Sequence, residues 1–138
     1  MKNTGHEEMK NGHSEWIRTK DNFRIRVAFW PKEDALGTVL IFPGRNEYIE
    51  KYGRTSKKIW ELGYSSLVVD WRGQGLSGRL TKDKHLGHVD KFEDYDSDLL
   101  EIFDNIITKC INQPTFTSLY IKFLNNSFSL ISIRTVTL

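Results

Sequence analysis

Between residues 15 and 29, apolar side chains recur at every second position on either side of a polar turn at 20–22. This alternation predicts a β-hairpin, because successive side chains of a strand point to opposite faces of a sheet. Two later stretches, 38–42 and 66–69, are short and mainly apolar without alternation. Such stretches are typical of strands that are buried on both faces.

Helical spacing follows the first buried stretch. Over residues 48–62, the positions that we expect to face the core recur every three or four residues, and Gly63 supplies a stop signal. The expected core positions of this helix are Ile49, Tyr52, Ser56 and Ile59.

A longer helix is predicted over residues 91–112, with Asp90 and Glu93 as a capping pair and Pro114 beyond its end. The residues expected on its buried face are Phe92, Tyr95, Leu99, Ile102, Phe103, Ile106 and Cys110. Those expected to face water are Glu93, Asp94, Asp98, Glu101 and Asp104.

The order of these elements predicts the α/β class, with a β-hairpin that leads into a mostly parallel sheet flanked by helices. Residues 1–14 are expected to form a flexible polar segment, and 15–114 the body of the domain. Residues 115–138 differ in composition, because all eighteen acidic residues and every glycine precede them. Within this divergent tail, 116–124 is expected to form the next strand of the sheet.

Length and composition set limits on function. A chain of 138 residues suits one domain with a real core. A formal charge of +2 without a long basic stripe argues against nucleic acid as a partner. The single cysteine, Cys110, and the lack of any long apolar run lead us to expect a cytoplasmic protein.

Glycine-rich turns follow both buried strands. The first reads P-G-R-N-E over 43–47, and the second reads D-W-R-G-Q-G-L-S-G over 70–78. In open α/β sheets, ligands bind where strands end in this way. A dinucleotide site needs G-x-G-x-x-G with a following helix and a later acidic residue, and that arrangement is absent here. No Walker G-x-x-x-x-G-K-[ST] occurs in the sequence either, so a phosphate cradle is not favoured.

The two turns together resemble the α/β-hydrolase superfamily, nearest to its lysophospholipase and monoacylglycerol-lipase branch, which is serine-aminopeptidase-like. The resemblance covers about residues 15–114 and implies hydrolysis of small-molecule or lipid esters through a serine acyl-enzyme, with no metal or organic cofactor. It implies that the backbone N–H of Arg45 is an oxyanion-hole donor, although Pro43 stands where the family usually has histidine. The residues of the two turns that would shape the site are Gly44, Asn46, Glu47, Asp70, Arg72, Gly73 and Gly75.

The nucleophile motif of the family, G-x-S-x-G, does not occur in this sequence. Ser127 falls in the expected position, but Asn125 and Ser129 replace both glycines. No acid or histidine follows Ser127, although the family order is serine, acid, histidine. No complete triad is therefore expected.

We accordingly expect an inactive, truncated or frameshifted N-terminal part of a lysophospholipase-like hydrolase. The alternatives are a non-catalytic ligand-binding module and the complementing half of a split hydrolase. Peripheral contact with a membrane follows from the resemblance as a further expectation, and the oligomeric state stays open.

Overall fold

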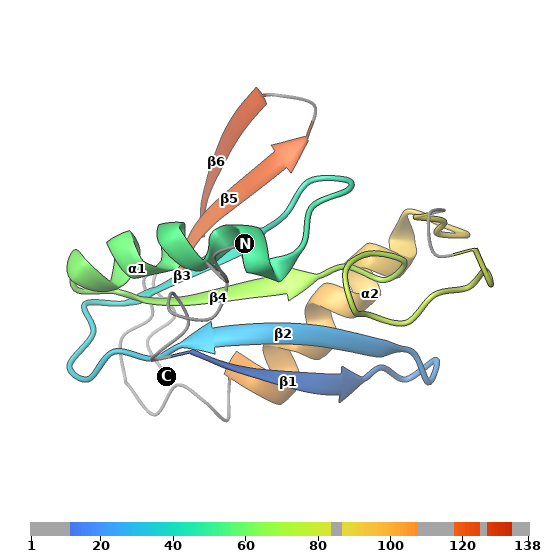
Figure 1. Cartoon of the computed structure of the whole chain (residues 1–138), viewed down its shortest axis with the longest axis horizontal. Helices are drawn as coiled ribbons and strands as arrows, with labels where there is room; N and C mark the ends of the chain where they lie inside the picture. Colours follow the sequence, from blue (N-terminus) through green and yellow to red (C-terminus); the bar gives the residue numbers. More distant parts are fainter. Residues whose placement is uncertain (1–11, 84–86, 108–117, 125–126, 134–138) are drawn as a thin grey trace, which may run out of the picture.

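The computed structural model describes residues 12–83, 87–107, 118–124 and 127–133. Within them, six strands form one sheet in the order β1-β2-β4-β3-β5-β6. The strands are β1 (His13–Arg18), β2 (Arg24–Trp30), β3 (Thr38–Phe42), β4 (Ser65–Asp70), β5 (Ser118–Leu124) and β6 (Ser127–Ile133). The α/β class predicted from the sequence is confirmed (Figure 1).

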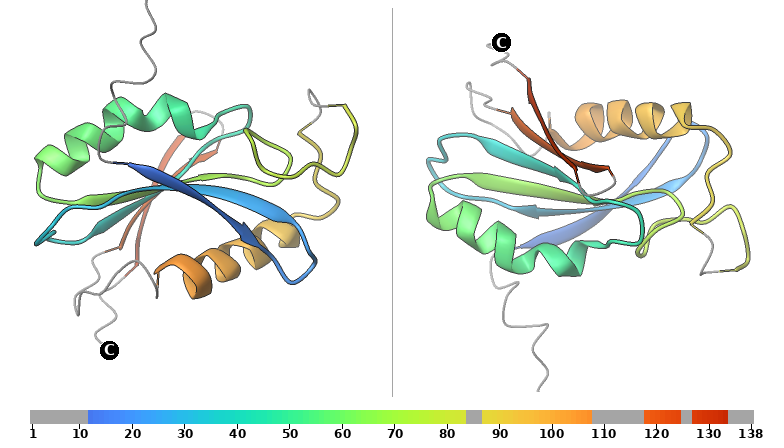
Figure 2. Two further views of the ribbon diagram at one scale, coloured as in Figure 1. Left: turned by 60° about the horizontal axis from the view of Figure 1, so that its bottom comes forward. Right: turned by 90° about the horizontal axis from the view of Figure 1, so that it is seen from above.

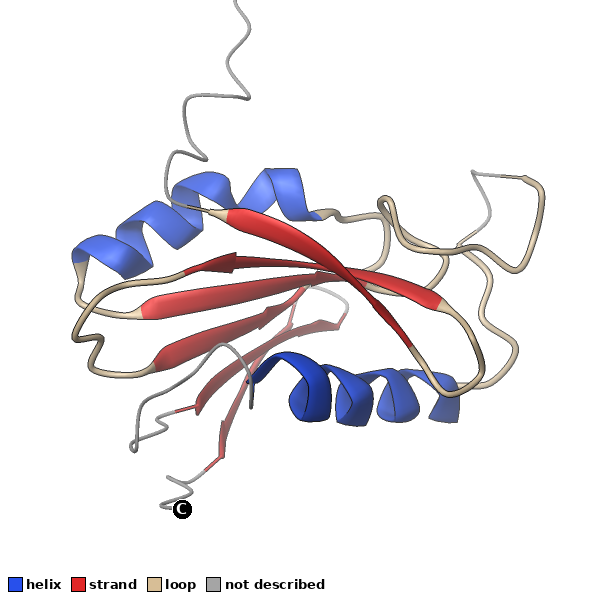
Figure 3. Cartoon of the chain, turned by 90° about the horizontal axis from the view of Figure 1, so that it is seen from below, coloured by secondary structure: helices blue, strands red, loops and turns tan. Residues whose placement is uncertain are grey.

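Helices cover both faces of this sheet. The 3-10 turn η2 (Ile49–Tyr52) runs directly into α1 (Gly53–Glu61) on one face, and α2 (Glu93–Ile102) lies on the other. A π-helical turn, η3 (Phe103–Ile107), continues α2. Figures 2 and 3 show α1 and α2 on opposite sides of the strands, which gives three layers.

The predicted hairpin is confirmed as the antiparallel pair β1 and β2, with Trp16 opposite Arg26. Its turn is closed by Thr19, whose hydroxyl accepts the amide of Phe23 at 2.9 Å, and Asn22 takes a left-handed φ of 66°. Strand β2 then pairs with β4, also antiparallel. The hairpin thereby covers the edge of β4, which would otherwise be exposed.

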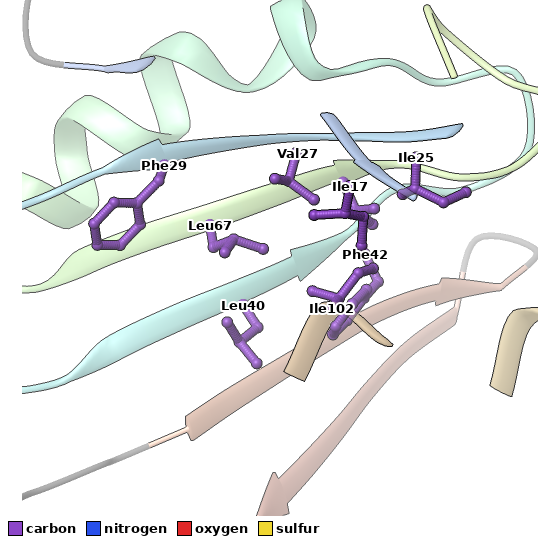
Figure 4. Packing of buried hydrophobic residues seen from close by; sticks show 9 residues of the cluster. Ile17, Ile25, Val27, Phe29, Leu40, Phe42, Leu67 and Ile102 are labelled. Carbon is purple, nitrogen blue, oxygen red and sulfur yellow. The ribbon is translucent and has the colours of Figure 1, made fainter. Parts of the chain in front are cut away.

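Strands β3 and β4 are parallel, as the two buried stretches predicted. Every residue of both strands is buried, because helices cover the sheet on each side. On the α2 face, side chains from four strands and Ile102 form one cluster, which Figure 4 shows. On the α1 face, Ile49 and Tyr52 pack on Val39, Ile41 and Val68. The expected inward face of this helix is thus confirmed.

The second helix departs from expectation at its start. It begins at Glu93, and Asp90 does not cap it; instead the Asp94 carboxylate accepts the amide of Lys91 at 3.2 Å. Phe92, expected in the core, is 59% exposed, whereas Asp98, expected to face water, is fully buried. Asp98 was expected on the water-facing side because it is charged. In the structure, the guanidinium of Arg72, which follows β4, binds its carboxylate in the interior. Ile106 and Cys110 lie outside the residues whose side chains the structure describes.

The C-terminal region adds two strands. Strand β5 pairs with β3 in parallel and begins two residues later than the predicted stretch 116–124. Strand β6 returns antiparallel to β5, an element that the sequence pattern did not predict. Strand β1 begins at His13, and residues 1–11 of the expected flexible segment lie outside the described residues. In the part of the chain that the structure describes, no helix combines the length and apolarity that crossing a bilayer would require.

Candidate functional site

Both glycine-rich turns lie at the carboxyl edge of the sheet, because β3 and β4 run parallel. Together they line a cleft of about 580 Å³, to which Asn46 and Glu47 contribute from the first turn and Gln74 and Gly75 from the second. Sites in open α/β sheets form at this edge. The two glycine-rich motifs therefore lie side by side at this edge of the sheet.

Nearly all backbone amides of the first turn are hydrogen-bonded within the protein. The amide of Glu47 donates to the carbonyl of Gly44 at 3.2 Å, and the amide of Gly44 donates to the Glu47 carboxylate at 3.2 Å. The amide of Asn46 donates to the side chain of Gln74 at 2.6 Å. Among the described residues of 44–47, the amide of Arg45 is the one without a partner. The turn therefore presents one free N–H donor on a fixed backbone.

Two features hold this turn in shape. Asn46 adopts a left-handed φ of 66°, a conformation that asparagine tolerates better than most residues. Glu47 accepts the hydroxyl of the buried Tyr52 at 2.5 Å. Burial first, and then the neighbouring Glu47 carboxylate, raise the pKa of Tyr52, so its hydroxyl stays a donor. The turn is thereby anchored to η2 behind it.

Asp70, at the end of β4, joins the two turns. Its carboxylate accepts the amide of Ile49 at 2.8 Å and the amide of Leu76 at 3.0 Å. Arg26 of the hairpin lies 3.3 Å from the same group. Burial raises the pKa of Asp70, while the two amides and Arg26 act against that rise. The position of this side chain supports a structural role between three elements.

The second turn requires glycine beside Asp70. Gly75 has a φ of +50°, and a Cβ built on it would lie 2.2 Å from the Asp70 carboxyl group. Any side chain there would displace that carboxylate. Arg79 closes the loop by donating to the carbonyl oxygens of Gly73 and Gly75.

Arg72 ties the second turn to the far face of the sheet. Its guanidinium forms a two-point contact with Asp98 of α2, with Nε to Oδ2 at 2.7 Å and Nη2 to Oδ1 at 2.5 Å. A third contact, at 2.9 Å, reaches Asp21 in the hairpin turn. Hydrogen bonding to Asp98 raises the pKa of Arg72, so the guanidinium is charged at all working pH values. This ion cluster joins the middle of α2 to the second turn and to the hairpin.

Aromatic side chains fill the floor between these parts. The ring of Trp71 stacks on Phe42 and meets Tyr95 edge-on, each with centroids 5.3 Å apart. The indole N–H of Trp71 donates to the carbonyl of Pro43 at 2.9 Å. Pro43, which stands where the α/β-hydrolase family usually has histidine, thus binds the second turn through its backbone carbonyl.

The proposed site-shaping residues Gly44, Asn46, Glu47, Asp70, Arg72, Gly73 and Gly75 are all brought into these two turns. Ser127 opens β6 and pairs with Leu124 across an antiparallel hairpin. It does not lie at the start of a helix, where a nucleophile elbow holds its serine. Sequence reasoning missed two positioning residues, Gln74 and Asp98, since their contacts join segments 28 and 26 residues apart.

Comparison with known proteins agrees with this geometry. A family model described as serine aminopeptidase, S33, matches residues 33–118. Lysophospholipase L2 of Escherichia coli K12 is 51% identical over 79 residues, which are 57% of this chain and 23% of that protein. The chain therefore spans about a quarter of the length of this curated relative.

Solved structures show the same fold. The structure of DcsB with its substrate analogue superimposes with a TM-score of 0.62 and 19% identity, covering 78% of this chain and 36% of that one. A soluble variant of the monoglyceride lipase of Saccharomyces cerevisiae, with a substrate analogue, gives 0.55 and 24%, covering 70% and 31%. These likenesses establish the α/β-hydrolase fold of the described region.

Proposed function

The chain belongs to the serine aminopeptidase S33 family of α/β-hydrolases, and from this membership we propose that its two turns form the oxyanion side of a serine hydrolase site for lipid esters. The observation that carries the proposal is the amide of Arg45, which has no partner among the described residues, on a turn where the amides of Gly44, Asn46 and Glu47 are bonded within the protein. The lysophospholipase relative supports a carboxylic ester of a glycerol lipid as the substrate class. The single cysteine accords with a reducing compartment, and we place the protein in the cytoplasm.

The Arg45 amide would act on charge that develops during acyl transfer. When a nucleophile attacks an ester carbonyl, the oxygen becomes an oxyanion, and fixed N–H donors stabilise it. A rigid donor needs no reorganisation at that moment, and one such donor contributes about 3 kcal/mol in known hydrolases. The role needs only the backbone, so the identity of the Arg45 side chain is of little consequence to it.

We further propose that the 138-residue chain by itself does not turn over esters. Its sequence holds no G-x-S-x-G and no acid or histidine after Ser127, and a serine hydroxyl without a base is a poor nucleophile. Two alternatives predict the same inactivity, namely a ligand-binding module and one half of a split hydrolase. Both use the same cleft and the same free amide.

The decisive experiment is a chimera in which the 79-residue matching segment replaces its counterpart in E. coli lysophospholipase L2. We expect the chimera to hydrolyse lysophosphatidylcholine. Arg45→Pro, which removes the N–H, should lower kcat about 100-fold or more, whereas Arg45→Ala should leave it within about twofold. Equal loss in both variants would contradict the backbone role.

The chain alone supplies the second arm. We expect no release of p-nitrophenol from p-nitrophenyl butyrate above the uncatalysed rate. Turnover that Ser127→Ala abolishes would overturn the proposal of inactivity. Saturable binding of a lysophospholipid without hydrolysis would favour the ligand-binding module.

A further inference from the structure

The two helices that cover the sheet carry opposite charge. Residues 93–107, which form α2 and η3, hold six acidic side chains and no lysine or arginine. In α1, the cations Arg54, Lys57 and Lys58 outnumber the single acidic residue, Glu61. The whole chain has a formal charge of only +2. The two signs of charge are therefore sorted onto different layers of the molecule, although neither is in large excess.

Part of the negative charge on α2 is neutralised within the protein, and part is not. Cations of the chain reach the carboxylates of Asp94, Asp98 and Glu101. Glu93 and Asp96 are exposed, and among the described residues no cation lies in salt-bridge range of either. These two carboxylates are therefore available to a partner outside the chain.

The outer surface of α2 combines these two carboxylates with exposed apolar side chains. Phe92 and Leu100 are 59% and 65% exposed. With 3.6 residues per turn, an arc of about 100° around the helix axis contains all four residues, Phe92, Glu93, Asp96 and Leu100. We call these four residues the acidic face. Apolar side chains gathered inside a charged surface are typical of an interaction site.

The outer surface of α1 has the complementary composition. Lys57 and Lys58 are exposed, and within the described part of the chain no carboxylate is in salt-bridge range of them. Leu62, directly after α1, is 72% exposed and lies one turn beyond Lys58. Arg54 is exposed one turn before Lys58, and Glu61 is the one acid on this side. We call Arg54, Lys57, Lys58 and Leu62 the basic face.

We propose that the acidic face of one copy of this chain binds the basic face of a second copy. Each face presents apolar side chains beside charges of the sign that the other face lacks. Contact between two acidic faces, or between two basic faces, would instead bring like charges together, which is unfavourable. The helices α1 and α2 cover opposite sides of the sheet (Figures 2 and 3), so the copies stack head to tail.

This association goes beyond the proposed function. No residue of either face lines the cleft, and the contact requires no nucleophile. The presence or absence of ester turnover therefore has no bearing on it. Because the charges of both faces are exposed, dissolved salt screens them, and the association is strongest at low ionic strength.

The experiment is sedimentation velocity of the 138-residue chain over a range of protein concentrations. We expect the weight-average sedimentation coefficient to rise with concentration in about 0.05 M NaCl, and the association constant to fall about tenfold or more in about 0.5 M NaCl. Two double variants reverse one face each. The acidic-face variant is Glu93→Lys with Asp96→Lys, and the basic-face variant is Lys57→Glu with Lys58→Glu. Each variant alone should associate at least about tenfold more weakly than the wild type.

Mixing the two variants gives the sharpest result. Each variant then meets a partner of opposite charge on both faces, so the equimolar mixture should regain the wild-type association constant to within about threefold. Restored association also shows that both variants are folded.

The control is Glu33→Lys with Asp83→Lys, which makes the same change in net charge at exposed loop positions outside both faces. It should associate within about twofold of the wild type. A wild type that stays monomeric in low salt would overturn the proposal. So would association that does not respond to salt, a control as weak as the acidic-face variant, or a mixture no more associated than its two components.

Discussion

Removing the guanidinium of Arg72 while its partner remains should be among the most damaging single changes in the molecule. Asp98 is fully buried and Arg72 is 2% exposed, so neither charge can be hydrated when the other is lost. Breaking a buried pair by removing one partner costs about 3–5 kcal/mol. The two other partners of Arg72, Asp21 at 2.9 Å and Asp94 at 3.7 Å, have side chains that are 52% and 27% exposed and can return to water. We therefore expect Arg72→Met to lower the free energy of unfolding by about 3–5 kcal/mol, most of it from Asp98.

The double variant Arg72→Met and Asp98→Leu tests the cause. It removes both charges and fills the space with apolar groups, so it should recover most of the loss and come within about 1–2 kcal/mol of the wild type. Lys20→Met is the matched control, since Lys20 pairs with Glu101 at 3.4 Å but its side chain is 89% exposed. The Lys20 ammonium lies in water, and Glu101, whose side chain is 12% exposed, keeps the amide of Asn105 as a second partner at 3.2 Å. We therefore expect Lys20→Met to lower the free energy of unfolding by less than about 1 kcal/mol.

Urea titration followed by tryptophan fluorescence measures all four proteins. Burial already raises the pKa of Asp98, and without Arg72 to oppose it the pKa should rise further. The Arg72→Met variant should therefore be less destabilised at about pH 5 than at about pH 8, because protonation removes the stranded charge. A double variant no more stable than Arg72→Met, or a loss independent of pH, would refute the reasoning.

Two further predictions concern the junction at Asp70. Gly75→Ala should lower the free energy of unfolding by about 2–4 kcal/mol in the same titration, because its Cβ would lie 2.2 Å from the Asp70 carboxyl group at a left-handed φ. The control is Gly87→Ala, whose Cβ would lie 3.7 Å from its nearest neighbour. This variant should change the free energy of unfolding by less than about 1 kcal/mol. Equal effects would show that the contact with Asp70 is unimportant. Burial raises the pKa of Asp70, so its contribution to stability is present below the ordinary aspartate pKa and is lost as the pH rises through the raised value. Between about pH 4 and about pH 8, the wild type should therefore lose more stability, or gain less, than Asp70→Asn does, and parallel pH profiles would contradict this assignment.

The elements that could be predicted from the sequence are those in which the spacing of apolar residues follows the spacing of buried positions. The hairpin alternates because one face of β1 meets solvent, and β3 and β4 are apolar because helices cover both of their faces. The Ile49 helix was predictable for the same reason, since its inward face consists of small or apolar residues.

The sequence failed where one specific contact overrides the pattern. Asp98 looks like a solvent-facing residue until Arg72, which lies 26 residues earlier, is placed opposite it by the fold. Phe92 looks like a core residue, yet it precedes a helix that begins two residues later than expected. Strand β6 has a composition that favours a strand, but no glycine or proline marks a turn before it, and its register is set by pairing with β5.

The candidate site divides along the same line. The turns at 43–47 and 70–78 were predictable, because a left-handed or crowded backbone requires glycine, and glycine can be read directly from the sequence. The role of Gln74 was not, because an amide side chain in a loop is usually solvated. Only the parallel register of β3 and β4 brings it to the amide of Asn46.

Three contacts span the two turns: Asn46 to Gln74, Ile49 to Asp70, and Trp71 to Pro43. Each uses one group from either turn, so neither turn can shift without breaking a bond that the other holds. The direction of the Arg45 amide is consequently set by residues 43–79 and not by any group that would approach it from elsewhere. A free donor held this way keeps its geometry whether or not a nucleophile is present. For this reason, the chimera with E. coli lysophospholipase L2 tests the Arg45 amide itself. If Arg45→Pro and Arg45→Ala had the same kcat in an active chimera, the amide would not be an oxyanion donor.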